Sequence, residues 1–179
     1  MQIVKAPNNV LSTPTKKVEK IEKTLHELIK DMKHTLITAS DPEGVGLAAP
    51  QVGQGIQLFI IKPTKSSPIS VFINPEVTLI GKKVPRKTKE GKSKLEGCLS
   101  IDDIWGTVKR STKIHVTWLD EHSTSHEKDF TGWPATIIQH EKDHLDGILF
   151  PRRVLEQKGK LYRLKRDEKG EEYFDSLEL

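Results

Sequence analysis

Residues 139–147 read Gln-His-Glu-Lys-Asp-His-Leu-Asp-Gly and contain an H-E-x-x-H motif that begins at His140. On a helix, positions four residues apart lie on one face, so His140 and His144 can bind one metal ion. Glu141 lies between them and can take a proton from a water molecule that the metal polarises. The motif therefore predicts metal-assisted hydrolysis, but it leaves the substrate open.

The residues around the motif predict a buried helix that runs from Pro134 to about Asp146. Proline is favoured in the first turn of a helix, and Gly147 is well placed as the left-handed residue that ends one. Apolar residues flank the histidines at Ile137, Ile138, Leu145 and Ile148. The two imidazoles should therefore border a buried face.

Patterns elsewhere in the chain predict short strands and one further long helix. Apolar residues recur every three or four positions over residues 15–38, which is typical of an amphipathic helix. Strands are predicted at 56–62, at 70–80 with a break at Asn74-Pro75, at 106–119 and at 127–131, and a hairpin at 160–166 and 171–174. The predicted fold class is α+β, with short, mostly antiparallel sheets packed around the central H-E-x-x-H helix, an N-terminal amphipathic helix and a C-terminal hairpin.

The 179 residues suit a single domain over 1–179, with 35% hydrophobic and 30% charged residues. No apolar run approaches the ~18–20 residues of a membrane span, and the N-terminus lacks the layout of a signal peptide. Cys98 is the one cysteine, so an internal disulfide is impossible and a reducing compartment fits. We therefore expect a cytoplasmic protein with no membrane partner.

The net charge of +4 is concentrated in two clusters, residues 82–94 and residues 152–166. Such clusters permit transient association with an anionic surface such as the RNA of the ribosome. No aromatic interleaving and no nucleic-acid-binding motif accompanies them. Sequence-specific nucleic-acid binding is therefore not expected.

A catalytic metal site needs a third protein ligand, and the sequence offers few candidates. The metzincin pattern would place a histidine three residues after Gly147, but Phe150 stands there. Glu168 has a spacing that suits a thermolysin-type site, yet it falls in the predicted hairpin turn. Cys98 remains, and its thiolate would suit a borderline-soft dication. Gly97 beside it permits a close backbone approach.

Three separated segments resemble the signature motifs of the peptide deformylase family. They are Gly-Val-Gly-Leu-Ala-Ala-Pro-Gln at 44–51, Glu-Gly-Cys-Leu-Ser at 96–100 and Gln-His-Glu-Lys-Asp-His-Leu at 139–145. Their order and spacing also resemble the family, and the likeness spans about residues 3–155. The resemblance implies an enzyme that removes the formyl group from N-formylmethionyl peptides of newly made proteins and releases formate.

The resemblance also implies a role for each motif residue. Cys98, His140 and His144 would bind one divalent metal ion, which is Fe²⁺ in the cell, with Zn²⁺, Ni²⁺ or Co²⁺ able to replace it. Glu141 would act as general base and acid. The oxyanion would be stabilised by the Gln51 side chain and by the Leu99 backbone N–H.

The substrate of the family is a nascent formyl-methionyl polypeptide, whose methionine side chain enters a pocket beside the metal. Candidates to bind it are Val45, Gly46, Glu96, Gly97, Trp133 and Ile137. Asp143 occupies the aspartate position of the third motif, and we predict that it pairs with Arg110 to orient the ligands.

The chain departs from the usual family pattern at several positions. Asp102 replaces a common proline, Trp105 a frequent arginine and Trp133 a usual leucine. Two other functions compete with a deformylase: an H-E-x-x-H endopeptidase, and a non-catalytic binding module with the same fold. The presence of Gln51, Cys98 and Glu141 together argues against the binding module, which has no chemical need for them.

Overall fold

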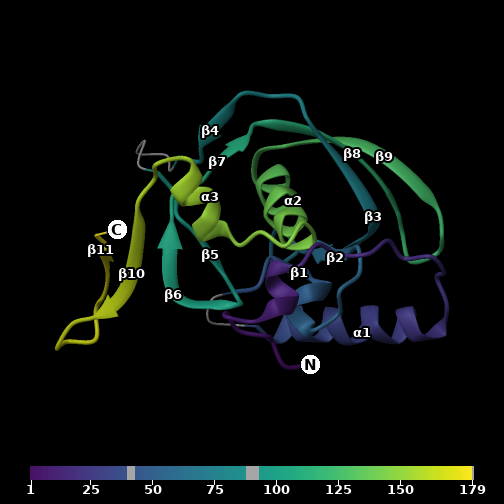
Figure 1. The fold of residues 1–179 in the computed structure, drawn as a ribbon, viewed down its shortest axis with the longest axis horizontal. Coiled ribbons are helices and arrows are strands. Elements are labelled where there is room, and N and C mark those ends of the chain that lie inside the picture. Colours follow the sequence, from purple (N-terminus) through teal and green to yellow (C-terminus); the bar gives the residue numbers. More distant parts are fainter. Residues whose placement is uncertain (40–42, 88–92, 179) are drawn as a thin grey trace.

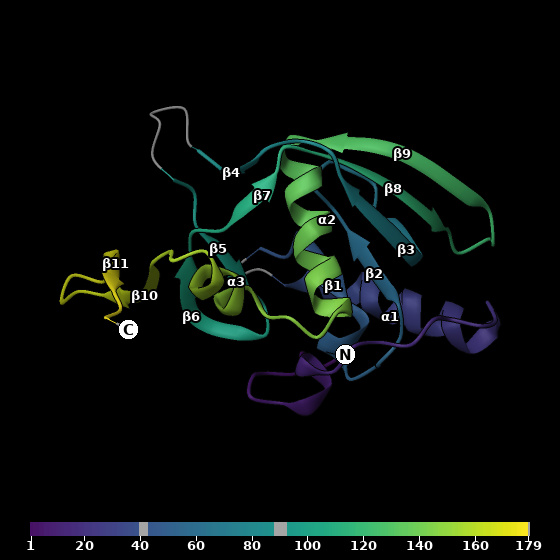
Figure 2. The same ribbon diagram turned by 45° about the horizontal axis from the view of Figure 1, so that its top comes forward.

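The computed structural model describes residues 1–39, 43–87 and 93–178. The motif helix α2 (Gly132–Leu145) lies at the centre, between a five-stranded sheet and a four-stranded sheet (Figures 1 and 2). Its buried apolar residues Ala135, Ile137, Ile138 and Leu145 pack in one cluster with residues of the five-stranded sheet. The motif is therefore held in the core, as the sequence predicts.

The larger sheet has the strand order β1-β2-β3-β8-β9, and all of its pairings are antiparallel. Its strands are β1 (Gly46–Ala48), β2 (Leu58–Ile61), β3 (Ser70–Leu79), β8 (Lys113–Leu119) and β9 (Ser125–Thr131). Strands β1 and β2 are buried along their whole length, because helices cover both of their faces. This sheet carries the first motif at its β1 edge.

The second sheet has the order β11-β10-β6-β5, and a short two-stranded sheet lies beside it. The second sheet contains β5 (Glu96–Cys98), β6 (Ile101–Gly106), β10 (Leu161–Arg166) and β11 (Glu172–Ser176). The short sheet pairs β4 (Lys83–Pro85) with β7 (Lys109–Ser111). The C-terminal hairpin β10–β11 therefore extends the sheet that bears the second motif.

The remaining helices cover the outside of the two sheets. They are α1 (Lys23–Thr38), α3 (Phe150–Glu156) and the 3₁₀ turns η1 (Asn9–Ser12) and η2 (Ala49–Val52). Helix α1 packs Ile29, Met32 and Leu36 onto β1, β2 and β3, and each of the three side chains is at most 1% exposed. Burying side chains of this size contributes about 1.5–3 kcal/mol each.

The α+β fold class is confirmed, as are α2 and the C-terminal hairpin. The predicted N-terminal helix was wrong over residues 15–22, because α1 begins at Lys23. Lys16 forms a bridge with Ile56, and the Asn74 side chain accepts a bond from the Val18 N–H and donates one to the Val18 carbonyl. These bonds to other parts of the chain hold residues 16–18 out of the helix, although Val18 still packs on the core.

The predicted break at Asn74-Pro75 interrupts β3 without ending it. Asn74 has a φ of 50°, and the pairing of β3 with β8 shifts between Ile73 and Glu76. This is a bulge in one strand rather than a boundary between two strands. Helix α3 and the pair β5–β6 were not predicted from the sequence. No helix in the described part of the chain is long and apolar enough to span a membrane.

Candidate metal centre and active site

Helix α2 presents His140 and His144 on one face, as the i, i+4 spacing predicts. The helix ends at Leu145, and Gly147 follows with a φ of 69°. A Cβ at Gly147 would lie 2.8 Å from backbone carbons of Ser12 and Thr13, so only glycine fits there. The N-terminal segment therefore packs directly against the end of the motif helix.

Cys98 comes to the two histidines from the end of β5. Its Sγ lies 3.2 Å from His144 Nε2, and one ligand atom each of Cys98, His140 and His144 lies within 4.8 Å of the others. The pairing of β5 with β6 shifts between Glu96 and Cys98, which directs the sulfur toward α2. The third ligand predicted from sequence is thus adjacent to the first two.

The donor atoms suit a divalent metal ion. One thiolate and two imidazoles leave a fourth position open, which is the arrangement of catalytic rather than structural sites. Among the described residues, Glu141 Oε2 and His144 Nδ1 are buried without a hydrogen-bond partner. Buried polar atoms are rarely left unpaired, and a carboxylate oxygen in this position can receive a bond from a water molecule in the open position.

The charge states of the donors favour binding of a metal. Burial raises the pKa of the Cys98 thiol, but His144 and His140 oppose it and bring the pKa well below its usual value. Burial lowers the pKa of His140, yet hydrogen bonds to Cys98 and Glu96 bring it well above its usual value. A thiolate beside a protonated imidazole is the state in which a dication can replace the proton.

Glu141 has the properties of a group that exchanges protons near neutral pH. Burial raises its pKa to about 7, against the opposing effect of His140 and His144. Its Oε1 lies against the backbone of Gly46, where a Cβ would be only 2.2 Å away. The first motif therefore needs glycine at this position so that the carboxyl group fits.

Gln51 is fixed by both ends of its side-chain amide. Its Oε1 accepts a bond of 2.9 Å from the Ala48 N–H, and its Nε2 lies 3.2 Å from Ser100 Oγ and 3.4 Å from Cys98 Sγ. The acceptor bond from Ala48 identifies the amide nitrogen as the end that faces the sulfur. An N–H donor is thereby aimed at the metal centre.

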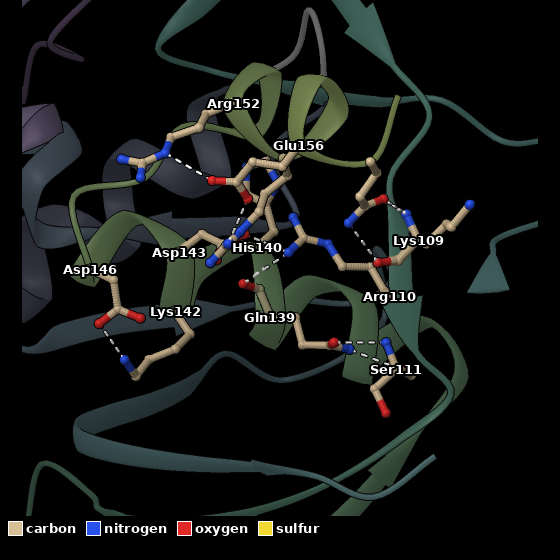
Figure 3. Close-up of polar contacts among 12 residues, drawn as sticks. Lys109, Arg110, Ser111, Gln139, His140, Lys142, Asp143, Asp146, Arg152 and Glu156 are labelled. Carbon is tan, nitrogen blue, oxygen red and sulfur yellow. Dashed lines mark hydrogen bonds and ion pairs between the residues drawn. The ribbon is translucent and has the colours of Figure 1, made fainter. Parts of the chain in front are cut away.

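A chain of ion pairs extends from His140 to the surface of α3. Glu96 lies 3.2 Å from His140 Nδ1 and accepts two bonds from Arg110, of 3.0 and 2.9 Å. Arg110 also donates to Asp143, as the sequence predicts (Figure 3). Asp143 accepts two further bonds from Arg153. Because each carboxylate is paired, this network holds the imidazole of His140 in one orientation.

Gln139 ties the motif helix to β7. Its Oε1 accepts a bond of 2.9 Å from the Ser111 N–H, and its Nε2 donates one of 3.0 Å to the Ser111 carbonyl (Figure 3). A side-chain amide thus pairs with a backbone amide as a neighbouring strand would. The residue before His140 is joined to the strand that bears Arg110.

A cavity of about 180 Å³ opens in front of the metal donors. All predicted site residues except His144 line it: Val45, Gly46, Gln51, Glu96, Gly97, Cys98, Leu99, Trp133, Ile137, His140 and Glu141. Trp133 is held by a bond of 3.0 Å from its Nε1 to the Pro63 carbonyl, and the Arg86 guanidinium lies 3.7 Å from its ring centre. His144 is 1% exposed and does not line this cavity.

A family model for polypeptide deformylases matches residues 1–160. The chain belongs to the polypeptide deformylase family. The peptide deformylase of Aquifex aeolicus is 41% identical over 157 residues, which are 85% of this chain and 86% of that protein. Enzymes of this family depend on a metal, so the Cys/His/His group is the expected place for it.

Solved deformylase structures have the same fold as this chain. The peptide deformylase of Thermotoga maritima has a TM-score of 0.74 and 31% identity, and the match covers 85% of this chain and 95% of that one. A deformylase of Synechococcus elongatus, solved with actinonin, has a TM-score of 0.75 and 34% identity over 86% of this chain and 78% of that one. The fold and the family are therefore consistent with each other.

Several residues around the site were not predicted from the sequence. Glu43 and Leu95 also line the cavity, and Ser100 and Arg153 support Gln51 and Asp143. Glu43, Leu95 and Ser100 lie in or beside a motif, so their position was a usable signal. Arg153 carried no such signal, because its pairing depends on how α3 folds back onto α2.

Proposed function

We propose that this chain hydrolyses the formamide bond of N-formylmethionyl peptides and holds one divalent metal ion with Cys98, His140 and His144. The observation that carries the proposal is the convergence of these three donors with the buried Glu141 on one cavity. Membership of the deformylase family supports the same reaction. The products are formate and a peptide with a free amino terminus.

Each residue has one task in this reaction. The metal ion, when bound, supplies a Lewis acid that polarises the formyl group and the attacking water. Glu141 takes a proton from that water as its oxygen bonds to the formyl carbon. Glu141 then gives the proton to the nitrogen as the C–N bond breaks. The Gln51 amide and the Leu99 N–H donate to the oxyanion, and loss of one such donor typically costs about 2.7–4 kcal/mol.

The methionine side chain would enter the cavity between Val45, Trp133 and Ile137. The substrate backbone would lie along Gly44–Gly46 and pair with it as a strand does. Gly46, Gly97 and Glu96 line the cavity along this path. The two glycines make room for the side chains of Glu141 and Trp105 beside this path, and the large side chains select the methionine.

Fe²⁺ is the metal that we propose for the cell, with Zn²⁺, Ni²⁺ or Co²⁺ as functional replacements. The Cys/His/His donor set accepts all four, and affinity alone does not choose among them. Anaerobic purification followed by metal analysis tests this assignment. Recovery of zinc as the main metal from anaerobic preparations would contradict it.

The central experiment is a deformylation assay on a formyl-methionyl peptide with the wild type and with Glu141→Ala. We expect the wild type to release formate and the variant to lose about 10²–10⁴-fold in kcat. Metal content is measured on both proteins, since Glu141 is not a metal ligand in this assignment. A variant that keeps its metal and reacts at the full rate would overturn the role of Glu141.

Two parallel reactions separate this function from its alternatives. An unmodified protein substrate is incubated with the enzyme, and its chain length is followed by mass spectrometry. Formate release without chain cleavage supports the deformylase, and cleavage of internal bonds supports an endopeptidase. Binding of the formyl peptide without formate release by metal-loaded protein would identify a binding module.

We also propose that residues 1–179 act as one catalytic domain in the cytoplasm, on nascent chains. Transient ribosome association stays a prediction, and residues 88–92 of the first basic cluster lie outside the described residues. In the second cluster, much of the charge is already neutralised by ion pairs: Arg152–Glu156, Arg153–Asp143, Lys165–Asp175 and Arg166–Glu172. Co-sedimentation with ribosomes at low and at raised salt tests the association.

A further inference from the structure

We propose that Trp105 and Phe174 form a platform for the third residue of the substrate, and that this platform selects an apolar or aromatic side chain there. The inference rests on the proposed function and concerns substrate choice beyond methionine. It also assigns a role to the C-terminal hairpin, which takes no part in the reaction itself.

Trp105 lies on β6 directly beside the metal-binding strand. The ring carbons of Trp105 would be 2.9–3.1 Å from a Cβ at Gly97, so the indole lies against the backbone of the residue before Cys98. Trp105 also lines the same cavity as Trp133 and Ile137. Its ring is therefore part of the wall along which a bound peptide passes.

The C-terminal hairpin supports this ring from the other side. Strand β10 pairs with β6, with Tyr162 opposite Trp105, and the hairpin extends beyond them (Figure 1). Phe174 on β11 meets Trp105 edge to face, with ring centres 5.8 Å apart and an angle of 71°. Phe174 is 48% exposed, so it leaves apolar surface free next to Trp105.

A second cavity also borders Trp105. It has a volume of about 390 Å³, and both Cys98 and Trp105 line the two cavities. Ile104 and Leu164 contribute apolar surface, and charged side chains complete its lining: Asp102, Asp103, Arg166 and Glu172. Because Cys98 and Trp105 belong to the lining of both cavities, the second cavity lies next to the metal donors.

The alternation of an extended chain decides which residue reaches the platform. Successive side chains of a strand point to opposite sides, so the first and third residues face one side and the second faces the other. The methionine side chain and Trp105 share one cavity, which assigns the third residue to the platform. Rings prefer offset or edge-to-face contact with an indole, and such contact is typically worth about two- to tenfold in affinity.

The test compares kcat/KM for three formyl peptides: formyl-Met-Ala-Ala, formyl-Met-Ala-Phe and formyl-Met-Phe-Ala. We expect the wild type to prefer phenylalanine over alanine at the third position by about three- to tenfold. At the second position the same exchange should change kcat/KM less than twofold. Trp105→Ala should bring the third-position ratio close to one, and Phe174→Ala should lower it part of the way.

Two further variants separate the platform from a general loss of structure. Trp105→Phe keeps a ring and should retain most of the preference. Tyr173→Ala removes a residue of similar exposure, 47%, that neighbours Phe174 on β11 and points to the opposite side of the strand. It should leave both the ratio and the rate on formyl-Met-Ala-Ala unchanged.

Three results would overturn the platform while the proposed function stands. They are a third-position ratio near one in the wild type, an unchanged ratio in Trp105→Ala, or a preference that resides at the second position. If the metal-loaded wild type releases no formate from any of the three peptides, the proposed function fails and the platform fails with it.

Discussion

The two sides of His140 differ in how completely their polar groups are paired. Behind its Nδ1, the side chains of Glu96, Arg110 and Asp143 are only 8–11% exposed, and all three are joined by ion pairs. In front, apolar walls surround Glu141, whose Oε2 has no partner among the described residues. The side with fully paired polar groups is suited to holding a metal ligand in one orientation. The side of Glu141 keeps an unpaired oxygen that can bond to water and substrate.

Removing Arg110 should give the largest change in stability, because it leaves two buried carboxylates without their shared partner. We expect Arg110→Met to lower the free energy of unfolding of the apoprotein by about 3–5 kcal/mol, measured by urea denaturation. Lys113→Met is the control, since its ion pair with Asp129 is 44% exposed on both sides. That variant should lose at most about 1 kcal/mol. Equal losses in the two variants would contradict the difference between buried and surface pairs.

Lowering the pH should destabilise the ion-pair network by protonating Glu96. Burial alone raises the pKa of this carboxyl group, but Arg110 and His140 outweigh it and lower the pKa from 4.5 to about 2. A folded-state pKa below the unfolded value means that the stabilisation is complete above about pH 4.5 and disappears as the pH falls through 2. Over this window the linkage amounts to about 3 kcal/mol.

The measurement is the unfolding free energy of the apoprotein at several pH values between 6 and 2. Glu96→Gln should show a shallower decline than the wild type, because it has no carboxyl group to protonate at this position. Parallel curves would show that other carboxylates dominate the acid response.

Adding one methyl group at Gly46 should disturb the position of Glu141. Gly46→Ala would place a Cβ 2.2 Å from Glu141 Oε1, so we expect a loss of about 1–3 kcal/mol in stability and a lower kcat as Glu141 moves. Gly55→Ala is the matched control, since a Cβ there meets nothing within 4 Å. Full activity of Gly46→Ala would mean that the carboxyl group has room to shift without consequence.

The smallest effect should come from the outer end of the ion-pair network. Arg153→Met removes two bonds to Asp143, and we expect a loss of about 1 kcal/mol in stability together with faster loss of the metal to a chelator. Arg152→Met changes the neighbouring arginine, which pairs with Glu156 and is 66% exposed. It should leave the rate of metal loss unchanged. If the two variants lose the metal at the same rate, Arg153 does not contribute to holding the ligands, and the ion-pair network that supports His140 extends only to Arg110 and its two carboxylates.

The motif helix with His140 and His144 could be predicted because it depends on spacing within a short segment. Cys98 and the ion pair of Arg110 with Asp143 join residues that are distant in sequence, and they were predicted from the resemblance of the motifs to a known family. Helix α3 could not, since its seven residues begin with Phe-Pro and show too little periodicity. The short strands β5 and β6 contain glycine and acidic residues, which are poor strand signals. Residues 15–22 have a helical pattern, but it is overridden because the Lys16 N–H donates to the Gly55 carbonyl and the Val18 N–H donates to Asn74 Oδ1.

The pairing of Gln139 with Ser111 has a consequence for the aim of the whole helix. A packed helix can turn about its axis, and a change of one residue in register would turn the imidazoles by about 100°. Two bonds of opposite polarity to one strand residue are satisfied at a single rotational setting. Gln139 therefore fixes the rotation of α2 about its axis. It sets the direction in which His140 and His144 point before any metal ion binds.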